Sequence, residues 1–315
     1  MLETNSPKVS ICVPTFNGAD YLRQAIDSVL EQDYQDFEIV IVDNCSTDQT
    51  AAVVDGLLPK AGGRIRFYQN DRNIGLAGNL NKCLEYAHGM YIKFLCVDDL
   101  LLPGCLEQMA VGLDTYPSVT VVCGGRLAIN EAGEALGLRR YASRSVMVRG
   151  HKAITRCLFG GNFIGEPTAV MFRKRDLTSC FREDLPQLMD MEVWFRLLEQ
   201  GDLLSIEAPL CTIRTHDAQM THVNFKSGKV VSDHVKIFDD YSHKAYLEIV
   251  PLLVIRHKLL MTYRVWMSRR FISNENRKMV LDRYAISVAY PLMPLIWFAV
   301  TLKKRIARSI EMLHL

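Results

Sequence analysis

The feature that most limits the folds open to this 315-residue chain is an alternation of two kinds of segment over its first 125 residues. Short, continuously apolar runs alternate with longer segments in which apolar residues recur at helical spacing. The runs cover residues 8–14, 37–43, 64–70, 91–99 and 119–125, and the helical segments cover residues 19–32, 47–58, 75–89 and 103–117. Runs without polar alternation are typical of strands covered on both faces. The pattern therefore predicts an α/β fold with a mostly parallel twisted sheet and helices on both faces.

Charge divides the chain into an acidic body and a basic tail. Residues 1–225 contain 21 Lys and Arg against 28 Asp and Glu, whereas residues 226–315 contain 16 against 7. The nine cysteines form no CxxC pair and no Cys/His cluster, which argues against a zinc site and against a disulfide framework. The N-terminus lacks the basic and apolar regions of a secretory signal, so we expect a cytoplasmic location.

Polar side chains follow the predicted strands at the points where those strands end. Thr15 and Asn17 follow the first strand, Asp43 ends the second, and Asp98 and Asp99 end the fourth. In parallel sheets, ligands bind beyond the carboxyl ends of the strands. A crevice lined by carboxylates would reject a bare phosphate, but it would accept a divalent cation that bridges them to a diphosphate.

Simpler interpretations of these loops remain open. Ser46 or Thr47 could cap the helix that follows residues 43–48. The first strand-to-helix turn contains neither GxGxxG nor GxxxxGK[ST], so a dinucleotide site and a P-loop both lose their main support.

Four blocks in the first 110 residues resemble the inverting family 2 glycosyltransferases of GT-A fold. They read VSICVPTFNGADYL, FEIVIVDNCSTDQT, NDRNIGLAGNLNKCL and FLCVDDLLLPGCLE. The resemblance implies an enzyme of bacterial cell-surface polysaccharide synthesis, a hexosyl- or N-acetylhexosaminyltransferase dependent on Mn²⁺ or Mg²⁺. Its donor would be a nucleotide-sugar, commonly a UDP-sugar, and its acceptor a hydroxyl of a lipid-linked or saccharide molecule.

The resemblance also implies roles for individual residues. Asp99 matches the direct metal ligand, and Asp98 matches a residue that meets the ribose or the metal. The other residues that match nucleotide contacts are Pro14, Thr15, Asn17, Asp43, Asn73, Gly75 and Asn79. The chain departs from the family pattern at Cys96, where many members have an acid, and this puts the strength of metal binding in question.

The second half contains a candidate catalytic base. QLMDMEVWFRLLEQGDL resembles the ED-x-x-x-W-x-R segment of the family, with Asp190 at the base and Met189 in place of the first acid. Helical spacing puts Trp194 on the same face as Asp190, so the ring would desolvate the carboxylate and make it a better base near neutral pH. Alternatively, Asp190 is a helix N-terminal acid favoured by the macrodipole. Glu192 is the alternative base.

Two further blocks resemble family segments around the acceptor and the diphosphate. GGNFIGEPT resembles an acceptor-side stretch, in which Glu166 is the candidate contact, with a solvated turn as the alternative. CTIRTHDAQMT resembles the R-x-H segment that closes over the diphosphate. Arg214 and His216 share one side of an extended strand, and His216 would ligate the metal or donate to phosphate. A purely structural histidine is the alternative.

The tail predicts a membrane contact. Residues 284–302 are 19 consecutive uncharged residues followed by Lys303, and they just reach the length of a bilayer span. Pro291 and Pro294 would kink such a helix. Residues 246–266 are helical in period and equally consistent with amphipathic docking. A core helix or a homodimer interface is the alternative for the tail.

The sequence thus predicts two regions. Residues 1–225 form a GT-A catalytic domain, with a nucleotide-binding half at 1–110 and an acceptor-binding half at 111–225. Residues 226–315 form a helical, basic region, peripheral to or anchored in the inner face of the cytoplasmic membrane. No nucleic-acid partner is expected. A non-catalytic sugar-nucleotide-binding or scaffold protein on the same fold is the alternative function.

Overall fold

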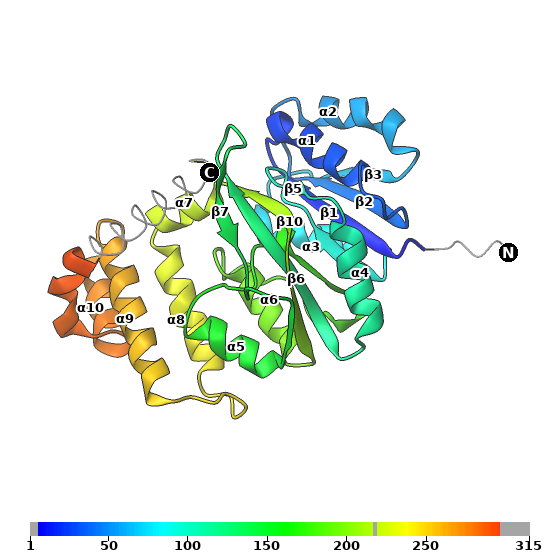
Figure 1. The fold of residues 1–315 in the computed structure, drawn as a ribbon. Coiled ribbons are helices and arrows are strands. Elements are labelled where there is room, and N and C mark those ends of the chain that lie inside the picture. The colour runs from blue at the N-terminus through cyan, green and yellow to red at the C-terminus, as the bar shows by residue number, and fades with distance from the viewer. Residues whose placement is uncertain (1–5, 217–218, 297–315) are drawn as a thin grey trace, which may run out of the picture.

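The computed structural model describes residues 6–216 and 219–296 (Figure 1). Its described strands form one ten-stranded sheet with the order β3-β2-β1-β4-β9-β6-β10-β5, while β7 pairs with β6 and β8 with β10. The strands are β1 Val9–Thr15, β2 Phe37–Asp43, β3 Ile65–Gln69, β4 Tyr91–Phe94, β5 Leu100–Leu101, β6 Val119–Ile129, β7 Ala135–Arg139, β8 Val146–Val148, β9 Val170–Arg173 and β10 Asp202–Arg214.

Helices connect and cover these strands. The α-helices are α1 Ala19–Leu30, α2 Thr50–Leu57, α3 Gly75–Tyr86, α4 Cys105–Thr115, α5 Gly150–Leu158, α6 Met189–Leu198, α7 Met220–Lys226, α8 Lys229–Tyr241, α9 Pro251–Met267 and α10 Asn274–Tyr284. Short 3₁₀ turns occupy Leu58–Ala61, Pro167–Ala169, Lys174–Asp176 and Ser287–Leu292. Helix α3 packs on β1 and β2, and α4 packs on β6.

The direction of the strands confirms the α/β expectation. Strands β1 to β4 pair in parallel, and β10 runs parallel to β6. Strand β9 is antiparallel to both β4 and β6, and it joins the two parallel groups. Every residue of β1 and β2 is buried, which explains why their sequences are continuously apolar rather than alternating.

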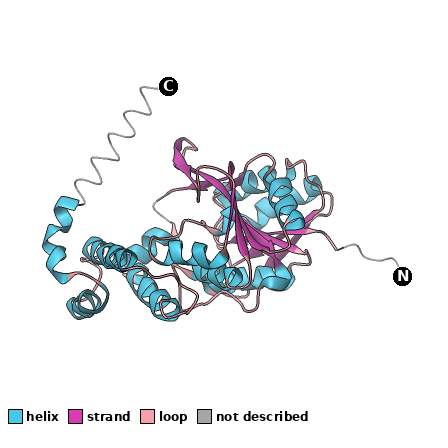
Figure 2. Ribbon diagram, turned by 60° about the horizontal axis from the view of Figure 1, so that its bottom comes forward, coloured by secondary structure: helices cyan, strands magenta, loops and turns pink. Residues whose placement is uncertain are grey.

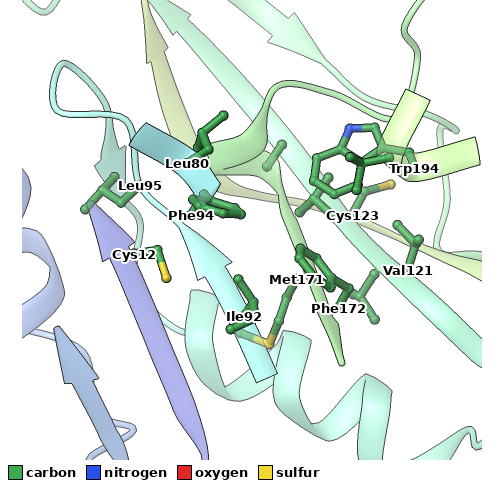
Figure 3. Packing of buried hydrophobic residues seen from close by; sticks show 14 of the residues in the cluster. Cys12, Leu80, Ile92, Phe94, Leu95, Val121, Cys123, Met171, Phe172 and Trp194 are labelled. Atoms are coloured by element: carbon green, nitrogen blue, oxygen red, sulfur yellow. The ribbon is translucent and has the colours of Figure 1, made fainter. Parts of the chain in front are cut away.

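One apolar core runs through both halves of the sheet (Figure 3). Phe94 of β4 lies 6.4 Å from Phe172 of β9, and Phe172 lies 5.8 Å from Trp194 of α6, measured between ring centroids. Val121 of β6 packs in the same cluster. The two halves therefore form one packed body, so the loops at its edge are fixed relative to one another.

The C-terminal helices begin with α7 at Met220, just before the boundary predicted at residue 225. Helix α8 lies beyond residue 225, yet its Ile237 and Tyr241 belong to the main core. Its Val231 belongs to a second, smaller cluster with residues of α9 and α10. Figures 1 and 2 show α9 and α10 at one end of the molecule, beside α8. The boundary predicted at residue 225 therefore does not separate two cores.

The predicted membrane span lies partly outside the described residues, since these end at residue 296. Within the described part, the chain leaves α10 at Tyr284 and forms a 3₁₀ turn that contains Pro291. No single described helix is long and apolar enough to cross a bilayer. Helix α10 and residues 287–296 would reach that length and composition only as a pair, and the pair is bent by 112°.

Candidate active site

The adjacent acids lie in a turn between β4 and the short strand β5. Strand β5 pairs with β10, which brings Asp99 beside the end of β10. The Asp99 carboxylate accepts a hydrogen bond from the Thr168 hydroxyl at 2.6 Å and another from the backbone N–H of Arg214 at 2.9 Å. Burial, followed by the charge of Asp98, raises the pKa of Asp99 well above its usual range. The negative charges of Asp98 and Asp99 therefore repel each other, and a nearby cation would weaken this repulsion.

Asp98 and His216 lie at the more exposed side of this turn. The Asp98 carboxylate is 3.0 Å from Nε2 of His216, and Nε2 of Gln219 donates to it at 3.3 Å. Both Asp98 and His216 are partly exposed. The structure therefore places His216 beside Asp98, whereas the carboxylate of Asp99, the next residue in the turn, is buried against Thr168 and the backbone of Arg214.

These three side chains fit a divalent cation only as an open site. Within the described residues, no group of three or more His, Cys, Asp or Glu is arranged to hold an ion by itself. In the same part of the chain, neither Asp98 nor Asp99 forms an ion pair with a lysine or arginine. Two uncompensated carboxylates beside an imidazole suit Mn²⁺ or Mg²⁺, which commonly take their remaining ligands from substrate phosphates. Asp98, Asp99 and His216 would hold such an ion.

The loops after β1 and β2 are locked to each other. The side-chain oxygen of Asn17 accepts a hydrogen bond from the Thr47 backbone N–H at 2.9 Å, and the Asn17 N–H donates to the Ser46 hydroxyl at 2.7 Å. Asn17 and Cys45 both have positive φ, at 50° and 64°. Side chains other than glycine rarely adopt this conformation, and it is concentrated at functional sites. The positive φ angles therefore indicate that these two loops have a functional role in addition to helix capping.

Asp43 is fully buried at the end of β2. Its carboxylate accepts hydrogen bonds from the Ser46 backbone N–H at 3.1 Å and from Nε2 of Gln69 at 2.8 Å. The Ser46 hydroxyl also bonds to it. Ser46 therefore does not cap α2, whose N-cap is Gln49 with no side-chain cap, and the capping alternative is wrong for Ser46.

A second network links the loops after β2 and β3. Nδ2 of Asn44 donates to the Asn73 side-chain oxygen at 2.9 Å, while the Asn44 oxygen accepts from Nδ2 of Asn70 at 3.1 Å. The backbone N–H of Gly75, which has φ 77°, donates to Asn73. Asn44, Asn70 and Gln69 were not singled out in the sequence, since isolated polar residues in loops carry no motif.

Three residues predicted to bind the nucleotide are buried instead. Nδ2 of Asn79 donates to the Val42 carbonyl at 2.9 Å, and its oxygen accepts from Asn70 at 3.0 Å. Pro14 and Thr15 lie within β1, and all residues of that strand are buried. The amide of Asn79 is thus fully used inside the protein. The side chains of Asn79 and Pro14 therefore shape the loops, and the expected direct contacts with a nucleotide are not available to them; the same holds for Asp43, which is also completely buried.

Asp190 lies in the first turn of α6, as predicted. Its carboxylate accepts hydrogen bonds from Nδ2 of Asn162 at 3.1 Å and from the Met191 N–H at 2.7 Å. The residue is largely buried but keeps some exposure to solvent. Burial, which outweighs these hydrogen bonds, raises the pKa of Asp190 to about 7, and the charge of Glu166 acts in the same direction. A carboxylate with this pKa can both accept and release a proton near neutral pH.

Trp194 was expected to lie beside Asp190 and to contact the acceptor or the diphosphate. Its ring is completely buried (Figure 3), and its Nε1 donates to the Gly165 carbonyl at 3.0 Å. The prediction of a direct acceptor or diphosphate contact is therefore wrong. Trp194 instead fixes the loop that carries Glu166, because its indole N–H would otherwise be buried without a partner.

Glu192 is excluded as the alternative base. It is buried, and its carboxylate forms an ion pair with Nε of Arg196 at 2.9 Å. Glu166, in contrast, is 39% exposed in its side chain and lies 3.2 Å from Nη1 of Arg126 and 3.8 Å from Nη1 of Arg139. The Glu166 charge raises the pKa of Asp99 as well as that of Asp190, so Glu166 lies near enough to both acids to act on them.

Arg214 is turned inward rather than toward a diphosphate. Its Nε donates to the Asp98 carbonyl at 2.9 Å, and Nη1 donates to the carbonyls of Asn130 and Glu131 at 3.2 and 2.9 Å. The guanidinium lies over the ring of Tyr21, 4.9 Å from its centroid. Because Arg214 is almost fully buried, the predicted diphosphate contact is corrected to a structural role in holding the turn of Asp98.

Thr168 connects the donor and acceptor loops, a role that its place at the end of the GGNFIGEPT block did not indicate. Its hydroxyl donates to Asp99 and accepts from the backbone N–H of Cys96 at 3.0 Å. The Thr168 carbonyl accepts from the ammonium group of Lys93, a completely buried lysine on β4. Thr168 follows Glu166 by two residues, so the position of Asp99 and that of Glu166 depend on each other.

The candidate site thus combines polar side chains at the carboxyl ends of the parallel strands β1, β2 and β4 with Asp190 and Glu166 from the second half of the chain. The sequence profile of the family described as glycosyl transferase family 2 matches residues 10–181. An uncharacterized protein of Mycobacterium tuberculosis is 35% identical over 258 residues, which cover 78% of this chain and 77% of the relative. An uncharacterized glycosyltransferase of Rickettsia typhi is 30% identical over 225 residues, 70% of this chain and 67% of its own length.

Solved structures share the fold at low sequence identity. S. aureus TarS in complex with UDP-GlcNAc has a TM-score of 0.60 at 20% identity, covering 90% of this chain and 75% of that one. The mannosyltransferase PcManGT from Pyrobaculum calidifontis, in complex with GDP-Man and Mn²⁺, has a TM-score of 0.61 at 17% identity, covering 97% and 84%. The chain therefore belongs to glycosyl transferase family 2, and it is a glycosyltransferase of GT-A fold.

Proposed function

We propose that this chain is a metal-dependent, inverting hexosyl- or N-acetylhexosaminyltransferase. It takes its sugar from a nucleotide-sugar, with a UDP-sugar as the first choice, and transfers it to a hydroxyl of a lipid-linked or saccharide acceptor in cell-surface polysaccharide synthesis. The observation that carries the proposal is the largely buried Asp190 carboxylate at the start of α6, which Asn162 holds in place and whose pKa is raised to about 7. A base with a pKa near the working pH is what the attack of a sugar hydroxyl requires.

The donor side of the cleft supplies binding and orientation. Asp43, Asn17 and Asn73 lie in loops held by their mutual hydrogen bonds, and these loops offer a fixed surface to a nucleoside. Asp98, Asp99 and His216 would hold the divalent cation. When bound, the cation neutralises charge on the diphosphate leaving group. Fixed loops cost little ordering entropy when the donor binds.

The acceptor side supplies the base. Asp190 removes the proton from the acceptor hydroxyl while that oxygen forms a bond to the anomeric carbon. The bond between this carbon and the diphosphate oxygen breaks on the opposite side, so the configuration inverts and the electron pair leaves with the diphosphate. The proton stays on Asp190 and is released to solvent. Asn162 holds the carboxylate in place through its hydrogen bond to Oδ2.

A thermal-shift screen of nucleotide-sugars tests the donor assignment. A ligand that binds only the native protein raises its melting temperature, and we expect UDP-sugars to do so more strongly with Mn²⁺ than without it. The matched variant is Asp43→Asn, which should weaken UDP-sugar binding while leaving the response to Mn²⁺ alone unchanged. If no nucleotide-sugar raised the melting temperature with either ion, the proposal would fail.

The predicted location at the inner face of the cytoplasmic membrane, through residues 284–302, remains a separate prediction. The same holds for the homodimer that the tail could form. Neither is required for the chemistry in the cleft, because the residues assigned to it all lie between Pro14 and His216.

A further inference from the structure

A cavity of about 620 Å³ lies between α5 and the start of α9, away from the cleft. Four cationic side chains line it, together with one carboxylate, Glu248. The cations are Arg149, Lys152, Arg156 and Arg256. Within the described residues, none of the four forms an ion pair with a carboxylate, and the guanidinium of Arg156 lies 4.2 Å from the ring centroid of Tyr141. The cavity therefore has an uncompensated positive charge.

The neighbouring acid does not neutralise this charge. Glu199 lies near the same cavity wall, but its carboxylate accepts a hydrogen bond from the Tyr246 hydroxyl at 2.7 Å and pairs with Lys244 at 3.1 Å. The ring of Tyr246 in turn stacks on His151 of α5, with 4.2 Å between centroids. These contacts join the α8–α9 connection to the first turn of α5 and give the cavity a fixed wall.

The cavity is not part of the donor site. Gly150, at the start of α5, packs against the carbonyls of Leu198 and Gly201, at the C-terminal end of α6. Asp190 lies at the other end of α6. Eight residues of helix separate Asp190 from Leu198, which is about 12 Å at 1.5 Å per residue. An anion in the cavity would therefore bind independently of the diphosphate in the cleft.

An exposed apolar strip adjoins the cavity on α9. Leu252, Ile255 and Leu259 are 72%, 50% and 40% exposed, and their i, i+3, i+7 spacing puts them on one face of the helix. Arg256, which lines the cavity, lies on the same face. The opposite face is buried through His257, Met261 and Val265. Val250, just before the helix, is 51% exposed and extends the strip.

We propose that the basic cavity and this apolar strip together form a docking surface for a membrane that contains anionic phospholipid. The phosphate headgroup occupies the cavity beside Arg149, Lys152 and Arg256, and the side chains of Leu252 and Ile255 enter the boundary between headgroups and acyl chains. Charge complementarity argues for this partner, because cationic residues next to an apolar helix face are the composition of interfacial helices. The sequence already allowed amphipathic docking by residues 246–266, which contain this face of α9. The basic cavity beside it was not expected from the sequence, and the surface does not include residues 284–302.

Cosedimentation of the full chain with vesicles tests the proposal without donor, acceptor or metal, so the result does not depend on transferase activity. We expect the chain to sediment with phosphatidylcholine vesicles that contain phosphatidylglycerol, and far less with phosphatidylcholine alone. Binding should weaken steeply as salt is raised, since salt screens headgroup attraction. Equal sedimentation with both vesicles, or binding that is insensitive to salt, would overturn the proposal with the wild-type protein alone.

Variants then locate the surface. Arg149→Gln, Lys152→Gln and Arg256→Gln combined should lower the partition coefficient about a hundredfold, since each cation near an anionic surface contributes about fivefold. The matched control combines Lys60→Gln, Lys82→Gln and Arg175→Gln, which remove the same charge elsewhere and should change binding less than about threefold. If both triple variants bind alike, the cavity is not the headgroup site.

The apolar strip is tested separately by Leu252→Ser and Ile255→Ser, each of which should weaken vesicle binding by about tenfold. Both side chains are exposed, so melting temperatures should stay close to that of the wild type. A second copy of the chain is the competing partner. If light scattering showed a wild-type dimer that these serine variants break, and vesicles failed to sediment the wild type, the strip would be a dimer interface and the proposal would be wrong.

Discussion

In the donor half of the sheet, polar side chains are held by each other, whereas in the acceptor half they are held by a buried aromatic core. Asn17, Asp43 and Asn73 each bond to a neighbouring loop at the strand ends. Asp190 and Glu166 instead depend on a loop whose Gly165 carbonyl is fixed by buried Trp194. The donor loops therefore form a rigid network, while the acceptor loop has few fixed points and leaves Asp190 and Glu166 partly exposed. This difference suits a constant nucleotide on one side and a variable acceptor on the other.

The largest expected effect is a loss of sugar-transfer rate without a loss of affinity for the nucleotide-sugar. Asp190→Asn should lower the rate of sugar transfer by about a thousandfold, since general base catalysis contributes on the order of 10²–10⁴. The affinity for the nucleotide-sugar, measured by titration calorimetry, should stay unchanged because Asp190 lies on the acceptor side. Glu192→Gln is the control for a neighbouring acid that is paired with Arg196. Transfer by Asp190→Asn at the wild-type rate would contradict the base assignment.

The next effect concerns the donor side. Asp99→Asn should weaken Mn²⁺-dependent binding of a UDP-sugar by about a hundredfold, because one of the carboxylates facing the cation is lost. Removing the metal with a chelator should lower donor binding of the wild type to the same level. If Asp99→Asn kept wild-type affinity in Mn²⁺, the metal role of Asp99 would be excluded.

The pH dependence of kcat/KM should further distinguish the acceptor side, which carries Asp190, from the donor side. The pKa of Asp190 is raised to about 7, and a general base works only when deprotonated. We therefore expect kcat/KM to fall about tenfold per pH unit below this pKa and to level off above it. Measuring donor binding at each pH removes contributions from the donor side. A rate that is flat between about pH 6 and pH 8 would contradict the assignment.

The smallest expected effect tests the link between the halves. Thr168→Val removes the hydroxyl that donates to Asp99 and should cost about 1–3 kcal/mol of unfolding free energy. It should also lower turnover several-fold, because Asp99 and the loop of Glu166 lose their common anchor. Thr120→Val is the matched control, since the Thr120 hydroxyl is also buried and donates to the Leu197 carbonyl at 2.8 Å. Similar loss of stability with normal turnover in the control would confirm the link, and equal turnover in both variants would refute it.

Sequence patterns predicted the framework of the molecule well. The expected strand at 37–43 matches β2, and the helical segment at 75–89 contains α3. These predictions succeed because a buried strand or helix requires a local sequence pattern, either a continuous apolar run or a helical period. Such a pattern can be recognised without knowing which distant residues pack against it. The family resemblance added the order of the loops, and the family profile and relatives confirm it.

Individual contacts were harder to predict. Trp194 and Arg214 were assigned to ligands because of their chemistry, yet both turn inward and hold backbone carbonyls. Whether such a side chain faces a cleft or the core depends on packing between segments that lie far apart in sequence. Thr168 was missed for the same reason, since its partner Asp99 is 69 residues away. The nucleotide and base assignments remain predictions for the experiments above.

Helix α8 contributes side chains to both apolar clusters, and this has a consequence for how the chain can be shortened or exchanged. A cut before α8 would remove Ile237 and Tyr241 from the catalytic body. A cut after residue 247 would keep these two side chains but would remove Leu253 and His257 of α9, which pack against Phe159 and the rest of the same core. Helices α8 and α9 therefore have to be kept, or exchanged together with the residues of the body that they contact.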